Sequence, residues 1–171
     1  MKTIVVGNGG SLLGRDMGDA IDSYDQVVRF NRCPTKGFEK HVGTKTDVWV
    51  ISIHGAIGRF AWPNKEPQPR TILCPPFQSY ASLEGLEREF RTKFELMPIE
   101  VAKEVESLFG GYPSTGLLAT YLFKPCTIIG FDHWSSKNHY GDDLVNPRSH
   151  DSDKERANFC YLETSGYIIR L

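Results

Sequence analysis

The sequence lacks an excess of charge of either sign and lacks any long apolar run. Its 171 residues include 20 lysines and arginines and 21 acidic residues, which gives a formal net charge of −1. This balance argues against a nucleic-acid-binding surface and against a disordered acidic tail. No run of about 18 apolar residues occurs, so no transmembrane helix is expected. The length suffices to bury a core, and residues 1–171 are predicted to form one domain.

Paired cysteines are also missing. The four cysteines stand far apart, with no C-x-x-C pair and no Cys/His cluster: Cys33, Cys74, Cys126 and Cys160. This spacing predicts no zinc site and favours free, partly buried thiols in a reducing compartment. The first expected strand begins at residue 2, which leaves no room for a signal peptide. We therefore expect a cytoplasmic protein.

The chain opens with a strand that runs into a glycine-rich turn, Gly7-Asn8-Gly9-Gly10-Ser11. Glycines let a ligand approach the backbone, and the N–H groups of a following helix attract anions. The dinucleotide fingerprint would need a glycine where Leu12 stands and an acidic residue where Asn31 stands. The turn also has no lysine, so both an NAD-dependent oxidoreductase and a P-loop fit poorly. The alternative is a tight connection that binds no ligand.

Short apolar strands alternate with helical stretches along the chain. Strands are expected at 2–7, 25–31, 46–53, 70–74, 126–131 and 167–171. Helices are expected at 79–92, 98–108, 115–123 and 153–163, and a short helix or irregular stretch at 10–20. Residues 32–45 and 54–69 are expected to form loops. This alternation predicts the α/β class, with a mostly parallel sheet flanked by helices. Ligands bind beyond the carboxyl ends of such strands. We therefore expect a site formed by the loops after 2–7, 25–31 and 126–131, together with 110–116.

Polar residues occur where these segments end. Asn8 and Asn31 end two strands, and their amides suit a phosphate oxygen, a ribose hydroxyl or a pyrimidine edge. The alternative is that both are turn residues that tolerate unusual backbone angles. Ser114 is a candidate N-cap for the helix at 115–123, and the start of that helix could also hold a ligand. Gly116 is costly within a first helical turn, which suggests that a ligand or another part of the chain comes close.

The polar loop after strand 126–131 supplies two histidines, His139 and His150. Histidine can act as a general base near neutral pH or as a cationic partner of phosphate, although many loop histidines are only solvated. Ser152 and Glu155 have the spacing of a capping box, which predicts a helix start and a structural role for Glu155. Asp132 follows the strand without a second carboxylate two residues later, so we predict no metal site there.

Together these segments resemble the animal-type sialyltransferases, glycosyltransferase family 29. The long motif of that family is similar to residues 5–46, from Val5-Val6-Gly7-Asn8-Gly9-Gly10-Ser11-Leu12 to Val42-Gly43-Thr44-Lys45-Thr46. The short motif resembles residues 113–131, the third resembles Asn138-His139-Tyr140, and the last, H-x-x-x-x-E, resembles His150 to Glu155. Four motifs in the same order make the resemblance specific.

The resemblance implies a single Rossmann-like domain of the kind called GT-A-like. The expected reaction moves sialic acid from CMP-sialic acid to a glycan hydroxyl with inversion, and needs neither a metal nor a further cofactor. The roles implied for the matching residues are contacts to the CMP donor by Gly7, Asn8, Gly9, Asn31, Ser114, Thr115, Gly116 and Tyr140, neutralisation of the departing phosphate by His139, and general-base catalysis by His150.

The sequence also departs from the family pattern. Thr3 and Phe123 stand where the family has its disulfide-bonded cysteines, which is consistent with a cytoplasmic, bacterial- or viral-like minimal form. The stretch between the long and short motifs is short, and in the family it shapes the acceptor site. The alternatives are therefore a transferase for CMP-Kdo or another CMP-linked sugar, and a CMP-binding module without catalysis.

Overall fold

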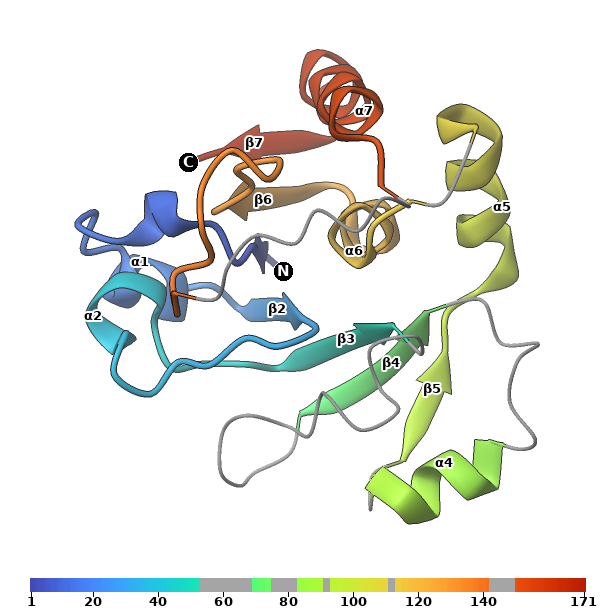
Figure 1. Ribbon diagram of the computed structural model, residues 1–171, viewed down its shortest axis with the longest axis horizontal. Helices are drawn as coiled ribbons and strands as arrows, with labels where there is room; N and C mark the ends of the chain where they lie inside the picture. The colour runs from blue at the N-terminus through green and yellow to red at the C-terminus, as the bar shows by residue number, and fades with distance from the viewer. Residues whose placement is uncertain (53–68, 75–82, 91–92, 111–112, 142–149) are drawn as a thin grey trace.

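The computed structural model describes residues 1–52, 69–74, 83–90, 93–110, 113–141 and 150–171. Within them, seven strands form one parallel sheet in the order β5-β4-β3-β2-β1-β6-β7 (Figure 1). The strands are β1 (Thr3–Val6), β2 (Gln26–Phe30), β3 (Val48–Ser52), β4 (Arg70–Cys74), β5 (Phe94–Leu96), β6 (Cys126–Ile129) and β7 (Ile168–Arg170). The predicted α/β class with a parallel sheet is confirmed.

Helices cover both faces of the sheet. They are the 3₁₀ turn η1 (Gly10–Leu12), α1 (Gly18–Asp22), α2 (Glu39–Val42), α4 (Leu83–Phe90), α5 (Ile99–Phe109), α6 (Thr115–Phe123) and α7 (Ser152–Thr164). In the view of Figure 1, α1 and α2 lie together on the left, and α5, α6 and α7 lie on the right. Among the described residues, one apolar cluster lies under α5, α6 and α7 and a second lies under α1 and α2, on opposite faces of the sheet.

The alternation of side chains along a strand explains the two cores. In β1, Val5 belongs to the core under α5, α6 and α7, whereas Ile4 and Val6 belong to the core under α1 and α2. Successive side chains of a strand point to opposite faces, so a strand covered on both sides is buried along its whole length and is mostly apolar. All four residues of β1 and all four of β6 are buried. Continuous runs of buried, mostly apolar residues therefore mark the centre of this sheet.

Two short elements differ from the sequence-based expectation. The strand β5 was not predicted, because it has three residues of which only Phe94 is buried. The helix α2 lies inside the expected loop 32–45 and has one turn, with Val42 as its buried residue. Such short segments show no periodicity that would separate them from a loop. The expected loop 54–69 falls outside the described residues except for residue 69, and so do both ends of the expected helix 79–92.

The glycine-rich turn serves the packing of the chain against itself. The Gly7 N–H donates to the Ile129 carbonyl at 2.7 Å, and a Cβ on Gly7 would lie 2.2 Å from the Gly130 carbonyl oxygen. A Cβ on Gly9 would lie 2.3 Å from the Asp132 carboxyl carbon. No side chain fits at such distances. The glycines therefore allow β1 and the loop after β6 to come into contact. The sequence alone did not reveal this reason for the glycines in the turn.

A buried arginine holds the connection between α2 and β3. Arg29 is 2% exposed, and its guanidinium donates to the Val42 carbonyl at 2.6 Å, the Lys45 carbonyl at 3.1 Å and the Thr46 hydroxyl at 3.0 Å. The Asp22 carboxylate accepts from the backbone N–H groups of Thr44 and Lys45. Buried charged groups need such partners. Arg29 therefore acts within the fold, even though it lies at the end of β2.

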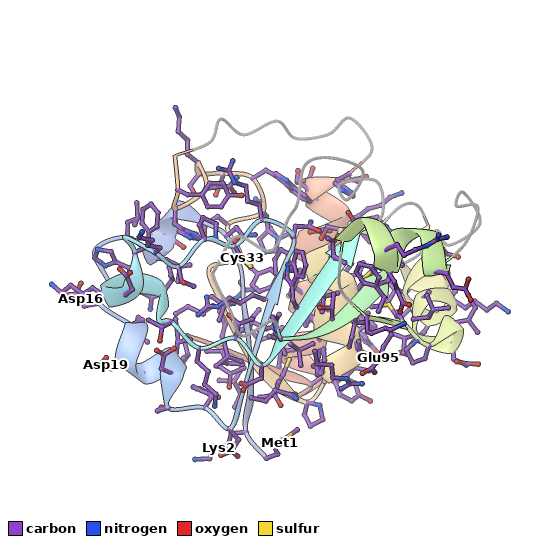
Figure 2. The ribbon with its side chains drawn as sticks, turned by 90° about the horizontal axis from the view of Figure 1, so that it is seen from below. Met1, Lys2, Asp16, Asp19, Cys33 and Glu95 are labelled. Atoms are coloured by element: carbon purple, nitrogen blue, oxygen red, sulfur yellow. The ribbon has the colours of Figure 1, made fainter. Side chains whose placement is uncertain are left out.

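The four cysteines are free thiols, as expected. Cys33, Cys74 and Cys126 are buried, and Cys160 is exposed. Figure 2 shows Cys33 among the packed side chains. Burial raises the pKa of Cys33 and of Cys126 to about 12, which keeps both as thiols at neutral pH. Within the described ranges, no helix is long and apolar enough to cross a membrane.

We predict that Gly7→Ala lowers the free energy of unfolding by at least about 2–3 kcal/mol, because the new methyl group meets a backbone carbonyl. The matched control is Gly14→Ala. Gly14 has open space around it and a φ of +84°, so only backbone strain of about 1–2 kcal/mol is expected there. Urea denaturation followed by circular dichroism measures both values. Equal losses in the two variants would contradict the close approach at Gly7.

Candidate functional site

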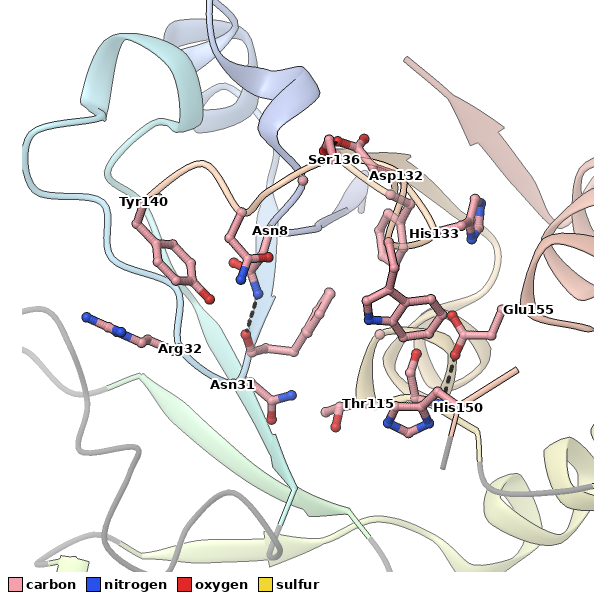
Figure 3. A pocket seen from close by; sticks show the side chains of 18 residues that line it. Asn8, Asn31, Arg32, Thr115, Asp132, His133, Ser136, Tyr140, His150 and Glu155 are labelled. Carbon is pink, nitrogen blue, oxygen red and sulfur yellow. Dashed lines mark hydrogen bonds between the residues drawn. The ribbon is translucent and has the colours of Figure 1, made fainter. Parts of the chain in front are cut away.

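A pocket of about 300 Å³ opens beyond the carboxyl ends of β1, β2 and β6 (Figure 3). The chain builds the sheet outward from β1 to β5 and then returns to place β6 on the other side of β1. The strand order thus reverses between β1 and β6, which is where ligands bind in open α/β sheets. Of the ten predicted site residues, eight line this pocket: Asn8, Gly9, Asn31, Ser114, Thr115, Gly116, Tyr140 and His150.

Two predicted site residues, Gly7 and His139, do not line the pocket. The backbone of Gly7 packs against the end of β6, as described above. His139 is 4% exposed, and its Nε2 lies 2.9 Å from the Pro34 carbonyl oxygen. Because a carbonyl only accepts, Nε2 carries the hydrogen. The contact of Gly7 with a donor and the contact of His139 with a departing phosphate stay predictions, and neither residue is in the pocket wall.

His139 instead joins three distant segments of the chain. Its backbone N–H donates to the Asn8 carbonyl at 2.9 Å, its ring binds Pro34, and the ring packs edge-on against Phe38 at 5.2 Å between centroids. Burial lowers the pKa of His139 despite the hydrogen bonds to Pro34 and Asn8. The imidazole is therefore neutral at physiological pH, and it fixes the turn after β1 against the loop after β2.

Asn8 and Asn31 each combine a structural contact with a group left for the pocket. The Asn8 Nδ2 donates to the Phe30 carbonyl at 3.2 Å, and its buried Oδ1 has no hydrogen-bond partner within the described part of the chain. Asn31 has a φ of 50°, and its Oδ1 accepts from the Ser52 N–H at 3.1 Å. The turn role considered for Asn31 is thus present. The Asn31 amide nitrogen is left to donate, whereas Asn8 offers an acceptor.

The start of α6 forms one wall of the pocket. The Ser114 hydroxyl accepts from the Leu117 N–H at 3.2 Å, which confirms Ser114 as the N-cap. A Cβ on Gly116 would lie 2.8 Å from the Phe30 ring and 2.9 Å from the Phe131 ring. The close approach suspected at Gly116 is therefore made by two aromatic rings of the chain itself. The positive end of this helix still faces the pocket.

The expected capping box at Ser152 and Glu155 is wrong. The N-cap of α7 is Asp151, whose carboxylate accepts from the N–H groups of Asp153 and Lys154 at 3.1 Å each. Glu155 turns away from its own helix start, and its carboxylate accepts from the Ser114 N–H at 2.9 Å. It lines the pocket while only 3% exposed. A short spacing pattern could not reveal which of two neighbouring helix starts this carboxylate would bind.

Burial raises the pKa of Glu155 to about 7, although the hydrogen bonds from Ser114 act in the opposite direction. The group therefore changes between a carboxylic acid and a carboxylate near neutral pH. In the neutral form it can donate a hydrogen bond, and in the ionised form it only accepts. This places a titratable acid against the start of α6, in the wall of the pocket.

An aromatic stack forms another part of the pocket. The rings of Trp134 and His150 lie 5.5 Å apart between centroids, with an angle of 17° between their planes. His133 and Trp134 have φ values of 47° and 58°, in the left-handed region that side chains rarely adopt. Figure 3 shows His133, His150 and Glu155 on the same side of the pocket. His133 and Trp134 carry no sequence pattern that would have singled them out.

Asp132 connects the turn after β1 to the loop after β6. Its carboxylate accepts from the Ser11 N–H at 2.9 Å and from the hydroxyls of Ser11 and Ser136. Burial alone would raise the pKa of Asp132, but the hydrogen bonds from the two serines outweigh it and hold that pKa below its usual value. In the part of the chain that the structure describes, no group of three or more His, Cys, Asp or Glu residues could hold a metal ion.

Comparisons with known proteins agree on one family. The family model "Glycosyltransferase family 29 (sialyltransferase)" matches residues 1–106. A human CMP-N-acetylneuraminate-beta-1,4-galactoside alpha-2,3-sialyltransferase is 50% identical over 58 residues, which are 34% of this chain and 16% of the relative. A mouse CMP-N-acetylneuraminate-beta-galactosamide-alpha-2,3-sialyltransferase 2 is 26% identical over 191 residues, covering 90% of this chain and 52% of the relative. The chain thus spans about half or less of the length of these relatives.

The folds agree as well. The crystal structure of a mammalian sialyltransferase superimposes with a TM-score of 0.70 and 24% identity, covering 99% of this chain and 68% of the other. A mammalian sialyltransferase in complex with Gal-beta-1-3GalNAc-ortho-nitrophenol gives a TM-score of 0.68 and 26% identity, with the same coverage. Because this similarity covers nearly the whole chain, it includes the strands and loops that form the pocket.

The raised pKa of Glu155 leads to a stability prediction. The ordinary pKa is 4.5, so the folded protein holds an extra proton between about pH 4.5 and about pH 7. The contribution of Glu155 to the free energy of unfolding is therefore full below about pH 4.5 and is lost as the pH rises toward 7. Glu155→Gln cannot ionise, and the decrease in stability with pH should be smaller by on the order of 2–3 kcal/mol.

Urea denaturation at about pH 5 and about pH 8 measures this difference, because these values bracket the titration. The exposed Glu106→Gln on α5 is the matched control and should follow the unmodified protein. If Glu155→Gln loses as much stability between the two pH values as the unmodified protein does, Glu155 does not titrate in this window.

Proposed function

Because the chain belongs to glycosyltransferase family 29, the sialyltransferase family, we propose that it transfers sialic acid from CMP-sialic acid to a hydroxyl group of a glycan. The observation that carries the proposal is the convergence of residues from distant motifs on one pocket. The turn after β1, the loop after β2, the start of α6 and the segment before α7 all contribute to it. A chance resemblance would not be expected to gather these residues at the switch point of the sheet.

The chemistry of the pocket suits a nucleotide with an anionic leaving group. The Asn31 amide nitrogen can donate to a base or ribose, and the Asn8 Oδ1 can accept from a ribose hydroxyl. The start of α6 contributes the positive end of a helix dipole, which stabilises negative charge that develops on a phosphate. Thr115, Gly116 and Tyr140 complete the proposed donor contacts.

We assign the general base to His150, in agreement with the resemblance described above. In this scheme the acceptor hydroxyl attacks the anomeric carbon from the side opposite the phosphate, and the bond from that carbon to the phosphate oxygen breaks. The hydroxyl proton moves to a ring nitrogen of His150, and CMP leaves with the bonding electrons. The stack on Trp134 limits the rotation of the imidazole, which helps to keep that nitrogen aligned.

The donor that the protein uses, and whether it transfers the sugar at all, distinguish this activity from two alternatives. The names of the human and mouse relatives combine CMP-N-acetylneuraminate with a beta-1,4-galactoside and with a beta-galactosamide. A screen of glycan acceptors with CMP-sialic acid and with CMP-Kdo distinguishes a sialyltransferase from a transferase for another CMP-linked acid. CMP binding without transfer to any acceptor would instead favour a binding module without catalysis.

We predict that His150→Ala lowers the rate of sialic acid transfer by roughly 10²–10⁴-fold, the usual contribution of a positioned general base. The affinity for CMP, measured by calorimetry, should change little, because CMP is the leaving group and not the group that is deprotonated. His41→Ala, on α2 and away from the pocket, is the matched control and should retain the full rate. If the His150→Ala enzyme kept its activity, His150 would not be the general base.

We also propose that transfer needs no metal ion, because the helix dipole of α6 and the polar groups of the pocket can stabilise the phosphate. Transfer should then continue at an unchanged rate after extensive dialysis against EDTA. The assay measures release of CMP with and without added magnesium or manganese. A rate that falls with EDTA and returns with either metal would contradict this part of the proposal.

A further inference from the structure

A guanidinium group stands at the edge of the pocket, in a position that the sequence motifs did not mark. Arg32 lines the pocket directly after Asn31, and its Cζ lies 5.1 Å from the centroid of the Tyr140 ring. We propose that Arg32, positioned by Tyr140, is the cationic contact for the phosphate of a bound cytidine nucleotide. This inference rests on the proposed function and adds to it the group that recognises the anion.

The charges around the pocket favour this assignment. Among the described residues that line it, Arg32 carries the single fixed positive charge. Asp132 and Glu155 are acidic, and His133 and His150 are titratable. Burial lowers the pKa of His133, which keeps that ring neutral at physiological pH. A nucleotide phosphate that enters this pocket therefore meets one fixed cation besides the positive end of α6, and a guanidinium binds phosphate through two parallel N–H groups.

The position of Arg32 separates this contact from the proposed chemistry at His150. In Figure 3, Arg32, Tyr140 and Asn8 lie on one side of the pocket, and His150 and Glu155 lie on the other. A phosphate bound to Arg32 would therefore leave the Asn8 Oδ1 for a ribose hydroxyl, and the side of the pocket around His150 for a transferred sugar and an acceptor. Arg32 thus affects the binding of the nucleotide without contact with the proposed base.

A series of buried contacts places the ring of Tyr140. The ring of His139, held by the Pro34 carbonyl, packs edge-on against Tyr140 at 5.0 Å between centroids, with an angle of 84°. The Tyr140 ring in turn offers its face to Arg32. A cation over an aromatic face is attracted to it and loses conformational freedom before a ligand arrives. His139 thus acts on the phosphate through Tyr140 and Arg32, without a contact of its own.

The nearby Arg29 shows by contrast what a structural arginine does in this fold. Its guanidinium is buried and donates to two backbone carbonyls and one hydroxyl of residues 42–46. Arg32 is exposed, and its guanidinium lies against an aromatic face in the pocket. The two arginines stand three residues apart, and they differ in burial, since Arg29 is 2% exposed and Arg32 lies at the surface of the pocket.

The test compares CMP with cytidine, which lacks the phosphate, by isothermal titration calorimetry. Arg32→Gln should weaken CMP binding by roughly tenfold or more, the usual effect of losing a charge-assisted hydrogen bond. Cytidine binding should change by less than about twofold, because no ionic contact is lost there. Lys36→Gln removes the same charge from the same loop outside the pocket and should bind both ligands as the unmodified protein does.

Variants of Tyr140 test how Arg32 is positioned. Tyr140→Phe keeps the ring face and should retain the preference for CMP over cytidine, whereas Tyr140→Leu should lose it. The double variant Arg32→Gln/Tyr140→Leu should show the same residual preference for CMP over cytidine as Arg32→Gln alone, because the two residues act as a unit in recognising the phosphate. Fully additive losses would overturn the positioning role of Tyr140.

The outcomes distinguish this inference from the proposed function. If the unmodified protein binds CMP and Arg32→Gln binds it equally well, the assignment of Arg32 is wrong and the proposed function stands. If Arg32→Gln weakens CMP and cytidine equally, Arg32 supports the pocket without contacting the phosphate, and the inference is also wrong. If the unmodified protein binds neither ligand, the proposed function and this inference fail together.

Discussion

The backbone contact between the turn after β1 and the end of β6 is the constraint on which the site depends. The Gly7 N–H donates to the Ile129 carbonyl at 2.7 Å, and the Gly9 N–H donates to the Gly130 carbonyl at 2.9 Å. No Cβ fits at Gly7, because the backbones of the two segments lie in direct contact there. Because the strand order reverses between β1 and β6, this contact sets the distance between the loops that carry Asn8 and Tyr140.

Several polar residues maintain that arrangement without facing a ligand. His139 joins the Asn8 and Pro34 backbones, and Asp132 joins Ser11 to the loop after β6. Each of these groups is buried or partly buried, and its hydrogen bonds offset the free-energy cost of removing it from water. They bring the pocket residues into register before a ligand binds. A site held in this way loses less conformational entropy when it binds its substrate.

The larger elements of the fold were predictable from the sequence, because burial on both faces makes the central strands β1, β2, β3 and β6 rich in β-branched and other apolar residues. The elements that escaped prediction, β5 and α2, are too short to show a period and depend on their neighbours for stability. The order of the motifs predicted which loops line the pocket. It did not reveal Trp134 or Arg32, because an aromatic or basic residue in a loop has no local signature that separates a pocket wall from solvent.

The sequence by itself determined the α/β class, the loops that form the site, the N-cap at Ser114 and the family resemblance, because these depend on local composition and on the order of motifs. Only the tertiary structure decided what individual side chains face. It placed the backbone of Gly7 against Gly130, the His139 ring against the Pro34 carbonyl, and the Glu155 carboxylate against the start of the neighbouring helix α6. Each of those partners lies at least 41 residues away, so the choice was made by long-range packing and by the need to satisfy buried polar groups.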